Sequence, residues 1–282
     1  MNLEKTQVNG FEGAFRGMRN PKNSWDRSDS WFGLLNLDYD DDILDEIVIQ
    51  WLKEDYPDLI RNTLLTKEQD KKYEKIIEWL LANGTLKTAV QDDDIIDAAF
   101  IGPKDMKLAK TLILAGNEHR KFMRQISVSV DVTAPFLWWK EFDTYKVATV
   151  RNSCSTMHTL LNQPFIAEQF TRYGINEVPE AREHFENTLK VLNWLRLKYM
   201  ENMDKKYWRA IIELLPDGFE LKATVTLNYE TLLSICSPGQ RRFHKLDEWS
   251  GIDFQGEKEN IISWARKLPY AQDLLFIDEQ VN

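Results

Sequence analysis

The chain has 282 residues, of which 43% are hydrophobic and 29% are charged. Such a globular composition excludes wholesale disorder, and the length is enough for a substantial core in one large domain or two small ones. The net charge of −9 disfavours nonspecific binding to nucleic acid, although it leaves room for a local basic pocket.

Residues 1–37 are predicted to be a loop or strand segment that packs on the core. Three glycines lie between residues 10 and 17, and Asn20-Pro21 follows, which is a composition typical of turns. The segment is also locally basic, with Trp25 among arginines and a lysine. We favour an ordered loop. The alternative is an arm or lid that contacts a phosphate, because glycine permits close backbone approach and arginine offers a planar fork.

Residues 38–97 are predicted to form an acidic helical insertion or subdomain. Apolar residues recur every three or four positions in 43–52 and again in 73–81, which indicates two amphipathic helices. Aspartate runs at 38–42 and 92–94 are expected to be solvated helix N-termini rather than a calcium loop. The whole block is of unknown purpose, and binding of a partner is one hypothesis.

Residues 98–282 are predicted to be the main domain. A helix is expected from Pro103 to Ala115, followed by an alternating strand at 126–132 and a helix that opens at Pro135. A second alternating strand is expected at 223–227. Further helices are expected at 165–173, 179–203, 205–214, 228–235, 244–251 and 258–267. The predicted fold class is therefore α+β, a helix-rich domain around a small, mainly antiparallel sheet.

Two polar stretches flank these elements, Asn117–Arg120 after the first helix and Thr149–His158 after the aromatic helix. Polar groups at the ends of regular elements are typical of a site. His158 follows Cys154 by four residues, so in a helix the imidazole would activate the thiol as a nucleophile. The alternative is that Cys154 is a small buried hydrophobic residue.

The cysteines and the N-terminus bear on location. Cys154 and Cys236 lack the spacing of a metal-binding pair, so we expect neither a disulfide scaffold nor a metal site, and a reducing cytoplasm fits best. The first ten residues contain no apolar signal core, and no apolar run is long enough to cross a membrane.

The order of these motifs resembles the flavin-dependent thymidylate synthases over roughly residues 100 to 275. A Glu118-His119 pair precedes a strand, a Pro-aromatic helix follows from Pro135, and a Ser/Asn-rich turn comes next. The second half continues with a Leu-Pro turn, a strand ending in Asn228, a helix ending in arginine, and His244-x-x-x-Glu248. The signature is degenerate: Thr144-Tyr145-Lys146 replaces Arg-His-Arg, and either Cys154 or Ser155 stands at the family's serine. This is typical of a divergent homologue of the kind carried by phages or prophages.

The resemblance implies methyl or hydroxymethyl transfer to C5 of a dUMP-type nucleotide, with FAD as cofactor and NADPH and methylenetetrahydrofolate as co-substrates. It also implies a homotetramer with active sites shared between subunits. The implied catalytic residues are Cys154, Ser155 and His158. The implied cofactor-binding residues are Glu118, His119, Tyr145, Lys146, Asn152, Asn228 and His244. The implied substrate-binding residues are Lys140, Glu141, Ser155, Arg241 and Arg242.

Simpler roles stay open for several of these residues. His119 could be a helix cap, Lys140 and Glu141 an adjacent surface charge pair, and Arg241 and Arg242 a solvated helix flank rather than a phosphate clamp. Two other functions are therefore also open, a non-catalytic nucleotide-binding protein that retains the fold and a partner-binding phage protein.

Overall fold

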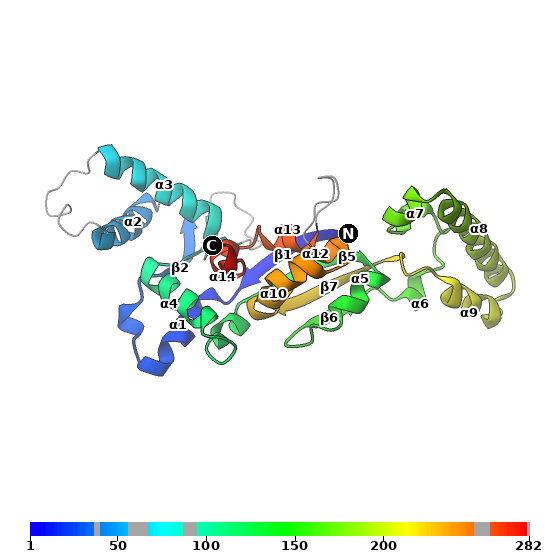
Figure 1. Ribbon diagram of the computed structural model, residues 1–282, viewed down its shortest axis with the longest axis horizontal. Coiled ribbons are helices and arrows are strands. Elements are labelled where there is room, and N and C mark those ends of the chain that lie inside the picture. The colour runs from blue at the N-terminus through cyan, green and yellow to red at the C-terminus, as the bar shows by residue number, and fades with distance from the viewer. Residues whose placement is uncertain (37–39, 56–66, 87–94, 251–259, 281–282) are drawn as a thin grey trace.

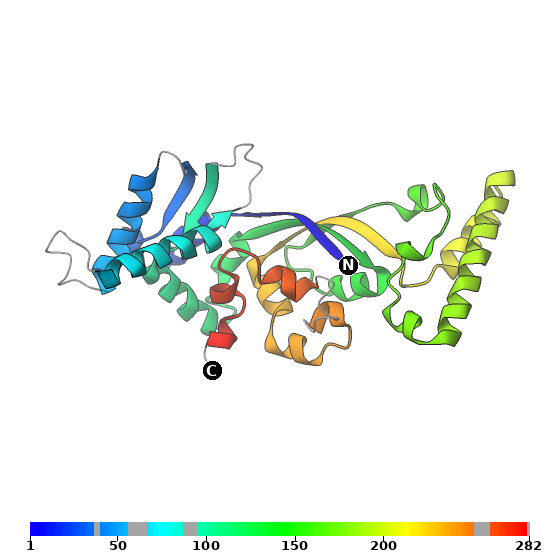
Figure 2. The same cartoon turned by 90° about the horizontal axis from the view of Figure 1, so that it is seen from above.

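The computed structural model describes residues 1–36, 40–55, 67–86, 95–250 and 260–280. The molecule is elongated, with a central sheet between one end that carries α2 and α3 and another that carries α7, α8 and α9 (Figures 1 and 2). The α+β class predicted from the sequence is confirmed. No helix in the described ranges is both long and apolar enough to cross a membrane.

The central sheet has four antiparallel strands. In spatial order they are β1 (Asn2–Asn9), β5 (Ser127–Pro135), β7 (Glu220–Asn228) and β6 (Val150–Ser153). Every second residue of β5 is buried, and Val130 lies opposite the buried Val225 of β7. This alternation is that of a sheet with one face turned to the core. Both predicted strands are confirmed and extended, and β6 occupies part of a stretch predicted to be a turn.

Aromatic helices cover the buried face of the sheet (Figure 1). They are α5 (Phe136–Phe142), α10 (Tyr229–Ile235), α12 (Asp247–Ser250) and α13 (Ile261–Ala265). Trp138 of α5 stacks on Phe142, with ring centroids 5.1 Å apart, and on Trp249 of α12 at 4.9 Å. Large rings bury much apolar area each, so these tryptophans hold the short helices on the sheet.

Several short elements complete the part of the molecule around the central sheet. The helices are α4 (Pro103–Leu114), α6 (Thr156–Thr159), α11 (Pro238–Phe243) and α14 (Ala271–Leu274), and the 3-10 turns are η1 (Asn20–Lys22), η2 (Trp25–Arg27), η3 (Lys121–Gln125) and η5 (Ile277–Gln280). The helices predicted at 103–115 and 228–235 are confirmed as α4 and α10. Those predicted at 244–251 and 258–267 are present but shorter, as α12 and α13, and residues 251–259 lie outside the described part.

Part of the N-terminal segment predicted to be a loop is helical. The helix α1 (Phe11–Arg19) buries Phe11, Phe15 and Met18 on one face. Its N-cap is Gly10, whose φ of 92° is in the left-handed region, and a Cβ added there would overlap the carbonyl oxygen of Gln125. Gly10 therefore permits the turn and the close approach to Gln125, while the spacing of the apolar residues favours the helix.

The acidic block contains strands as well as helices. The helices α2 (Asp41–Asp55) and α3 (Lys67–Asn83) confirm both predicted helices, and Asp41 and Asp42 lie in the first turn of α2 as predicted. A second sheet pairs β2 (Trp31–Asn36) and β3 (Thr85–Leu86) with β4 (Ile95–Phe100). The block is therefore not purely helical, which corrects the prediction. Residues 38–39 and 92–94 of the aspartate runs lie outside the described residues.

The far end of the molecule has its own apolar cluster. The helices α7 (Tyr173–Glu177), α8 (Pro179–Asn202) and α9 (Lys205–Leu214) enclose Phe185, Leu192 and Ile211. The helices predicted at 179–203 and 205–214 are confirmed. The helix predicted at 165–173 is wrong: this segment holds the 3-10 turn η4 (Ala167–Gln169). Phe165 and Phe170 are buried there by packing against α8 and its neighbours, and their spacing of five residues is not that of one helix face.

Candidate functional site

The polar segment 117–125 is a wall between two cavities. Gly116, with φ of 101°, ends α4, and the chain then passes through η3 towards β5. Asn117, Arg120 and Arg124 line a cavity of about 260 Å³, which we call the basic pocket. Glu118 and His119 line another of about 700 Å³, which we call the arm cavity. One segment can thus contact two ligand groups on opposite sides.

The basic pocket is formed where three segments meet. It is lined by Asn117, Arg120, Arg124, Thr144, Tyr145, Lys146, Val147, Glu230, Thr231 and Ser234. Three of these side chains are cationic and one is a carboxylate, so the lining has an excess of two positive charges. In a chain of net charge −9, this is a local reversal of sign that favours an anion.

Glu230 of α10 organises the arginines of the basic pocket. Its buried carboxylate accepts hydrogen bonds from Arg124, whose Nη2 lies 3.1 Å from Oε1, and from Arg120, whose Nε lies 3.5 Å away. The hydrogen bond from Arg124 is the main reason why the pKa of Glu230 is lowered; burial opposes this, and the charges of Arg124 and Arg120 add to it. The carboxylate therefore fixes both guanidinium groups at the pocket wall.

The start of α10 is held by Asn228. Its Oδ1 accepts from the backbone N–H of Thr231 at 2.9 Å, and its Nδ2 donates to the carbonyl of Val147 at 3.4 Å. Thr231 also donates its hydroxyl to the same carbonyl at 3.1 Å. In this structure the predicted cofactor contact Asn228 thus caps a helix and ties it to the loop that carries Tyr145 and Lys146.

The predicted pair Tyr145 and Lys146 lies in the basic pocket. Tyr145 stacks on Trp249, with ring centroids 5.6 Å apart, and its hydroxyl contacts Nε2 of Gln240. Burial is the main reason that the pKa of Tyr145 is raised, so the phenol stays protonated near neutral pH. Lys146 is exposed, and its ammonium group forms no ion pair with the residues that the structure describes.

His244 lies beside this cluster. Its Nδ1 accepts from the backbone N–H of Leu246 at 3.1 Å, so the neutral ring carries its proton on Nε2, which lies 3.7 Å from Glu141. Lys140 pairs with Asp217 instead of with Glu141. The predicted surface pair of Lys140 and Glu141 is therefore split, and Glu141 faces the histidine. Arg241 and Arg242 belong to α11, but their side chains lie outside the described part.

The arm cavity is bordered by the N-terminal segment. Residues 17–22 and Ser24 form one side, α4 forms another, and 118–125 closes it. Glu118 and His119 are exposed, and Glu118 pairs with Lys121 at 3.1 Å. Arg19 is committed to the buried Asp105, so it is not a free phosphate contact. The basic N-terminal segment thus packs on the domain as helix α1 and 3-10 turns rather than as the expected loop, and it also lines a cavity.

The predicted catalytic stretch lies elsewhere on the chain. The backbone N–H of Cys154 donates to the carbonyl of Lys222 at 2.9 Å, whereas Asn228 is six residues further along β7, about 20 Å at strand spacing. Ser155 is the N-cap of α6, and Cys154 and His158 are both exposed, with no hydrogen bond between them in the described residues. Asn152 is exposed on β6. The buried-cysteine alternative is wrong for Cys154.

Sequence reasoning missed Arg124, Glu230 and Gln240 as lining or supporting residues of the basic pocket. Arg120 and Arg124 are four residues apart, which is a weak signal that they share a side. Nothing in the sequence connects them with Glu230, which is more than a hundred positions away. In the described residues, no group of three or more His, Cys, Asp or Glu side chains could hold a metal ion.

Comparisons with known proteins concern the fold. No protein-family model and no curated protein matches the sequence. The structure of thymidylate synthase X from Helicobacter pylori with FAD and dUMP matches with a TM-score of 0.53 and 13% identity, over 99% of this chain and 98% of that chain. The chain has the thymidylate synthase X fold.

Two further structures are similar over less of the chain. Another flavin-dependent thymidylate synthase structure from Helicobacter pylori, with FAD and dUMP, has a TM-score of 0.47 and 16% identity, and covers 67% of this chain and 86% of that one. The UMP/dUMP methylase PolB from Streptomyces cacaoi, with 5-Br dUMP, has a TM-score of 0.43 and 14% identity over 62% and 82%. The fold likeness over almost all of this chain rests on the first of these structures, at 13% sequence identity.

Proposed function

We propose that the protein binds a uridine nucleotide of the dUMP type and transfers a methyl or hydroxymethyl group to its C5 atom in a flavin-dependent reaction. The observation that carries this proposal is the basic pocket. It lies where the resemblance places nucleotide and cofactor contacts, at Tyr145 and Lys146, in a chain with the thymidylate synthase X fold.

The size and charge of the basic pocket suit the phosphate end of a nucleotide. Its volume of about 260 Å³ is just below that of pockets that enclose a whole drug-sized ligand. A phosphate monoester carries about −1.5 to −2 charges near neutral pH, which the excess of two positive charges complements. Arg120 and Arg124 offer planar forks, and Lys146 offers a point charge.

The arm cavity fits a flavin. Its volume of about 700 Å³ is in the range of cofactor sites, and Met18, Leu108, Leu112 and Phe122 give it apolar walls. His119 and Gln125 provide polar groups at its border and would hold the edge of the ring system, with Glu118 nearby. When bound, FAD would supply hydride transfer, with NADPH and methylenetetrahydrofolate as the proposed co-substrates.

We propose that the active site is completed by a second subunit. Cys154, Ser155 and His158 are about 20 Å from Asn228 within one chain, so they would serve a neighbour's pocket in a homotetramer. This proposal includes their catalytic role. It also includes a substrate-binding role for Lys140, Glu141, Arg241 and Arg242, and a cofactor-binding role for Asn152 and His244. The phage-type origin and the cytoplasmic location are part of it as well.

The test combines two measurements on the purified chain. After incubation with FAD and desalting, we expect a flavin spectrum in the visible range. In calorimetric titration with dUMP, we expect Lys146→Ala to weaken binding about tenfold, since it removes one charge-assisted contact. The control Lys190→Ala changes an exposed lysine on α8, far from the pocket, and leaves the affinity unchanged.

A second function is favoured by one specific observation. The family's Arg-His-Arg is replaced by Thr144-Tyr145-Lys146, which suits a nucleotide-binding protein that has lost flavin chemistry. A protein that takes up no FAD but binds dUMP would support this alternative and defeat the enzyme. Absence of heat with any nucleotide would contradict both and leave a partner-binding role.

A further inference from the structure

Four oxidisable aromatic rings form a continuous row from the basic pocket to β6. Tyr145, which lines the basic pocket, stacks on Trp249 with ring centroids 5.6 Å apart. Trp249 stacks on Trp138 at 4.9 Å, and Trp138 meets Trp139 edge to face at 4.8 Å. The guanidinium of Arg151 in β6 lies 4.9 Å from the ring centroid of Trp139. We call Tyr145, Trp249, Trp138 and Trp139 the ring chain.

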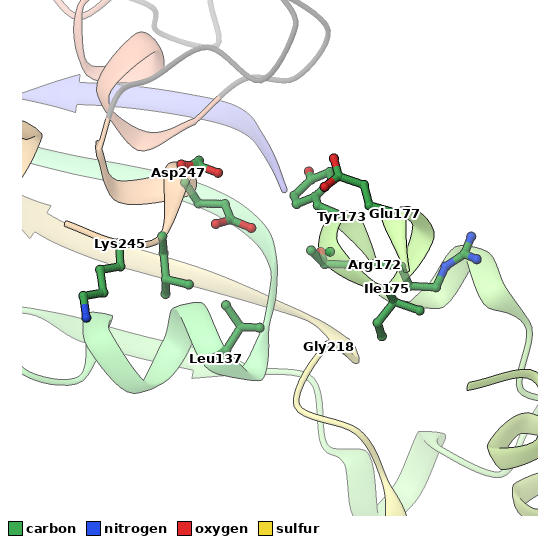
Figure 3. A pocket seen from close by; sticks show the side chains of 12 residues that line it. Leu137, Arg172, Tyr173, Ile175, Glu177, Gly218, Lys245 and Asp247 are labelled. Atoms are coloured by element: carbon green, nitrogen blue, oxygen red, sulfur yellow. The ribbon is translucent and has the colours of Figure 1, made fainter. Parts of the chain in front are cut away.

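The interior of the ring chain is closed to water. Trp138 and Trp249 are fully buried, and Trp139 is 2% exposed. Leu137 and Asp247, from the same two helices, line a cavity of about 440 Å³ between α5, α7 and α12 (Figure 3). No member of the ring chain lines that cavity, whereas Tyr145 lines the basic pocket. The row of rings thus has an insulated middle and an end that opens on a pocket.

Two buried indole groups distinguish this row from ordinary core packing. In the described part of the chain, the N–H groups of Trp138 and Trp249 have no hydrogen-bond partner, although most buried polar groups are paired. Burying an unpaired polar group costs free energy. A core that needed only apolar area would be filled at no such cost by phenylalanine, as at Phe142, which stacks on Trp138 at 5.1 Å.

The same two groups determine how an oxidised ring would behave. An indole N–H is a donor only, and the N–H groups of Trp138 and Trp249 face no acceptor among the described residues. After loss of an electron, each ring therefore remains a radical cation and takes an electron back from its neighbour. Tyr145 differs, because its phenol carries a proton that can leave through the basic pocket. The oxidised state should therefore come to rest on Tyr145 as a neutral tyrosyl radical.

We propose that the ring chain transfers single electrons from the basic pocket to one-electron oxidants at the β6 side, of the class of oxygen-centred peroxyl radicals. Trp139 gives one electron to the oxidant, and Trp138, Trp249 and Tyr145 each pass one electron along in turn. Tyr145 releases its phenolic proton into the basic pocket, and the peroxyl radical takes up the electron and a proton from water to become a hydroperoxide. This inference goes beyond the proposed function and does not depend on it, because only side chains of the protein take part.

The position of Cys154 permits a direct test. Cys154 is exposed and Cys236 is buried, so a thiol reagent labels Cys154 selectively. The backbone N–H of Cys154 donates to the carbonyl of Lys222, and the indole of Trp139 donates to the carbonyl of the adjacent Leu221. A ruthenium polypyridine complex attached to Cys154 therefore lies at the Trp139 end of the ring chain. A laser flash with an added electron acceptor converts the complex to ruthenium(III), a one-electron oxidant, and transient absorption follows the radicals of tryptophan and tyrosine.

In the full chain labelled in this way, we expect a tryptophan radical signal that decays into a tyrosyl signal. Tyr145→Phe should abolish the tyrosyl signal and leave the tryptophan radical. Trp249→Phe should also abolish the tyrosyl signal, because it keeps an aromatic ring in the stack and removes the oxidisable link. Trp138→Phe interrupts the ring chain at a second place and should have the same effect.

The matched control is Trp264→Phe, which changes a buried tryptophan of α13 that forms no ring contact with the ring chain in the described residues, and should leave the tyrosyl yield unchanged. Circular dichroism during heating establishes which variants are folded. The proposal would be overturned by the absence of a tyrosyl signal in the original chain, or by a tyrosyl signal that persists in Tyr145→Phe. A full tyrosyl yield in folded Trp249→Phe or Trp138→Phe would overturn it as well.

Discussion

At the scale of single residues, the basic pocket depends on a carboxylate that binds no anion itself. Glu230 forms ion pairs with Arg120 and Arg124. Lys146 is then the cation of the basic pocket that forms no ion pair with a described residue. The sequence predicted Tyr145 and Lys146 through their place in a family motif. It did not predict the arginine pair with Glu230, because only the tertiary fold joins η3 to α10.

Acid should destabilise the protein partly through Glu230. Its pKa is lowered in the folded state, so the stability it contributes is present above the unfolded pKa of about 4.3 and is lost as the pH falls through the folded pKa. Asp131, whose pKa is lowered mainly by its hydrogen bond from Thr224, acts with the same sign. We expect the melting temperature to fall below about pH 4.

The variant Glu230→Gln tests this assignment. At neutral pH it should lower the free energy of unfolding by about 1.5–3 kcal/mol, the range for hydrogen bonds to a charged group. Its melting temperature should then fall less steeply in acid than that of the original chain, as followed by circular dichroism over a pH series. If the melting temperature of the variant fell as steeply in acid as that of the original chain, Glu230 would not be a source of the acid destabilisation.

At the scale of elements, α1 shows how turn-forming residues in a sequence can conceal the apolar spacing of a helix. Its glycines and the following Asn20-Pro21 predicted a loop, yet Phe11, Phe15 and Met18 have helical spacing and are buried. The core contacts outweighed the low helix propensity of glycine. Longer periodic segments such as α8 were predicted correctly because no competing turn signal interrupts them.

Two glycines near the start of α1 should respond oppositely to alanine. Gly10→Ala should lower the free energy of unfolding by about 1–3 kcal/mol or more, since φ is 92° and the added Cβ would overlap the carbonyl oxygen of Gln125. Gly13→Ala lies in the helix with open space around it, and should raise that free energy by about 0.5–1 kcal/mol. Urea unfolding measures both. Equal effects would contradict the assigned role of Gly10.

The cap of α10 is a second element-level test. Asn228→Ala removes the acceptor for the N–H of Thr231 and the donor to Val147, and should cost about 1–2 kcal/mol of unfolding free energy. Asn228→Asp keeps the cap and should retain most of the stability. If both variants were as stable as the original chain, the amide would be available for the cofactor contact that the resemblance implies.

At the scale of the whole molecule, three apolar clusters follow the long axis, one at each end and one under the central sheet. The sequence predicted the class of fold and the central strands through alternation in β5 and β7. It did not predict the second sheet, because β2 and β4 are paired across some sixty residues of intervening chain. The division into segments 1–37, 38–97 and 98–282 stays a prediction.

The separation between Cys154 and the basic pocket requires a second copy if both serve one reaction. The helix α8 offers a surface for such a contact: Val191, Trp194, Leu197 and Met200 follow one another every three residues and are 46–56% exposed. Neighbouring apolar side chains of this size on a surface mark an interface. Because the family resemblance implies a homotetramer, we expect the 33.2 kDa chain to elute as a tetramer in size-exclusion chromatography with light scattering.

The double variant Trp194→Ser, Leu197→Ser should shift this tetramer to smaller species, since an apolar contact contributes about 25 cal/mol for each Å² removed from water. The double variant Glu183→Ser, Glu186→Ser changes polar positions of the same helix and should keep the tetramer. If both regions serve one reaction, activity should fall with the tetramer, because Cys154 bonds to Lys222, which lies about 20 Å along β7 from Asn228. A fully active monomer would show that each chain completes its own site, and would remove Cys154, Ser155 and His158 from the proposed reaction.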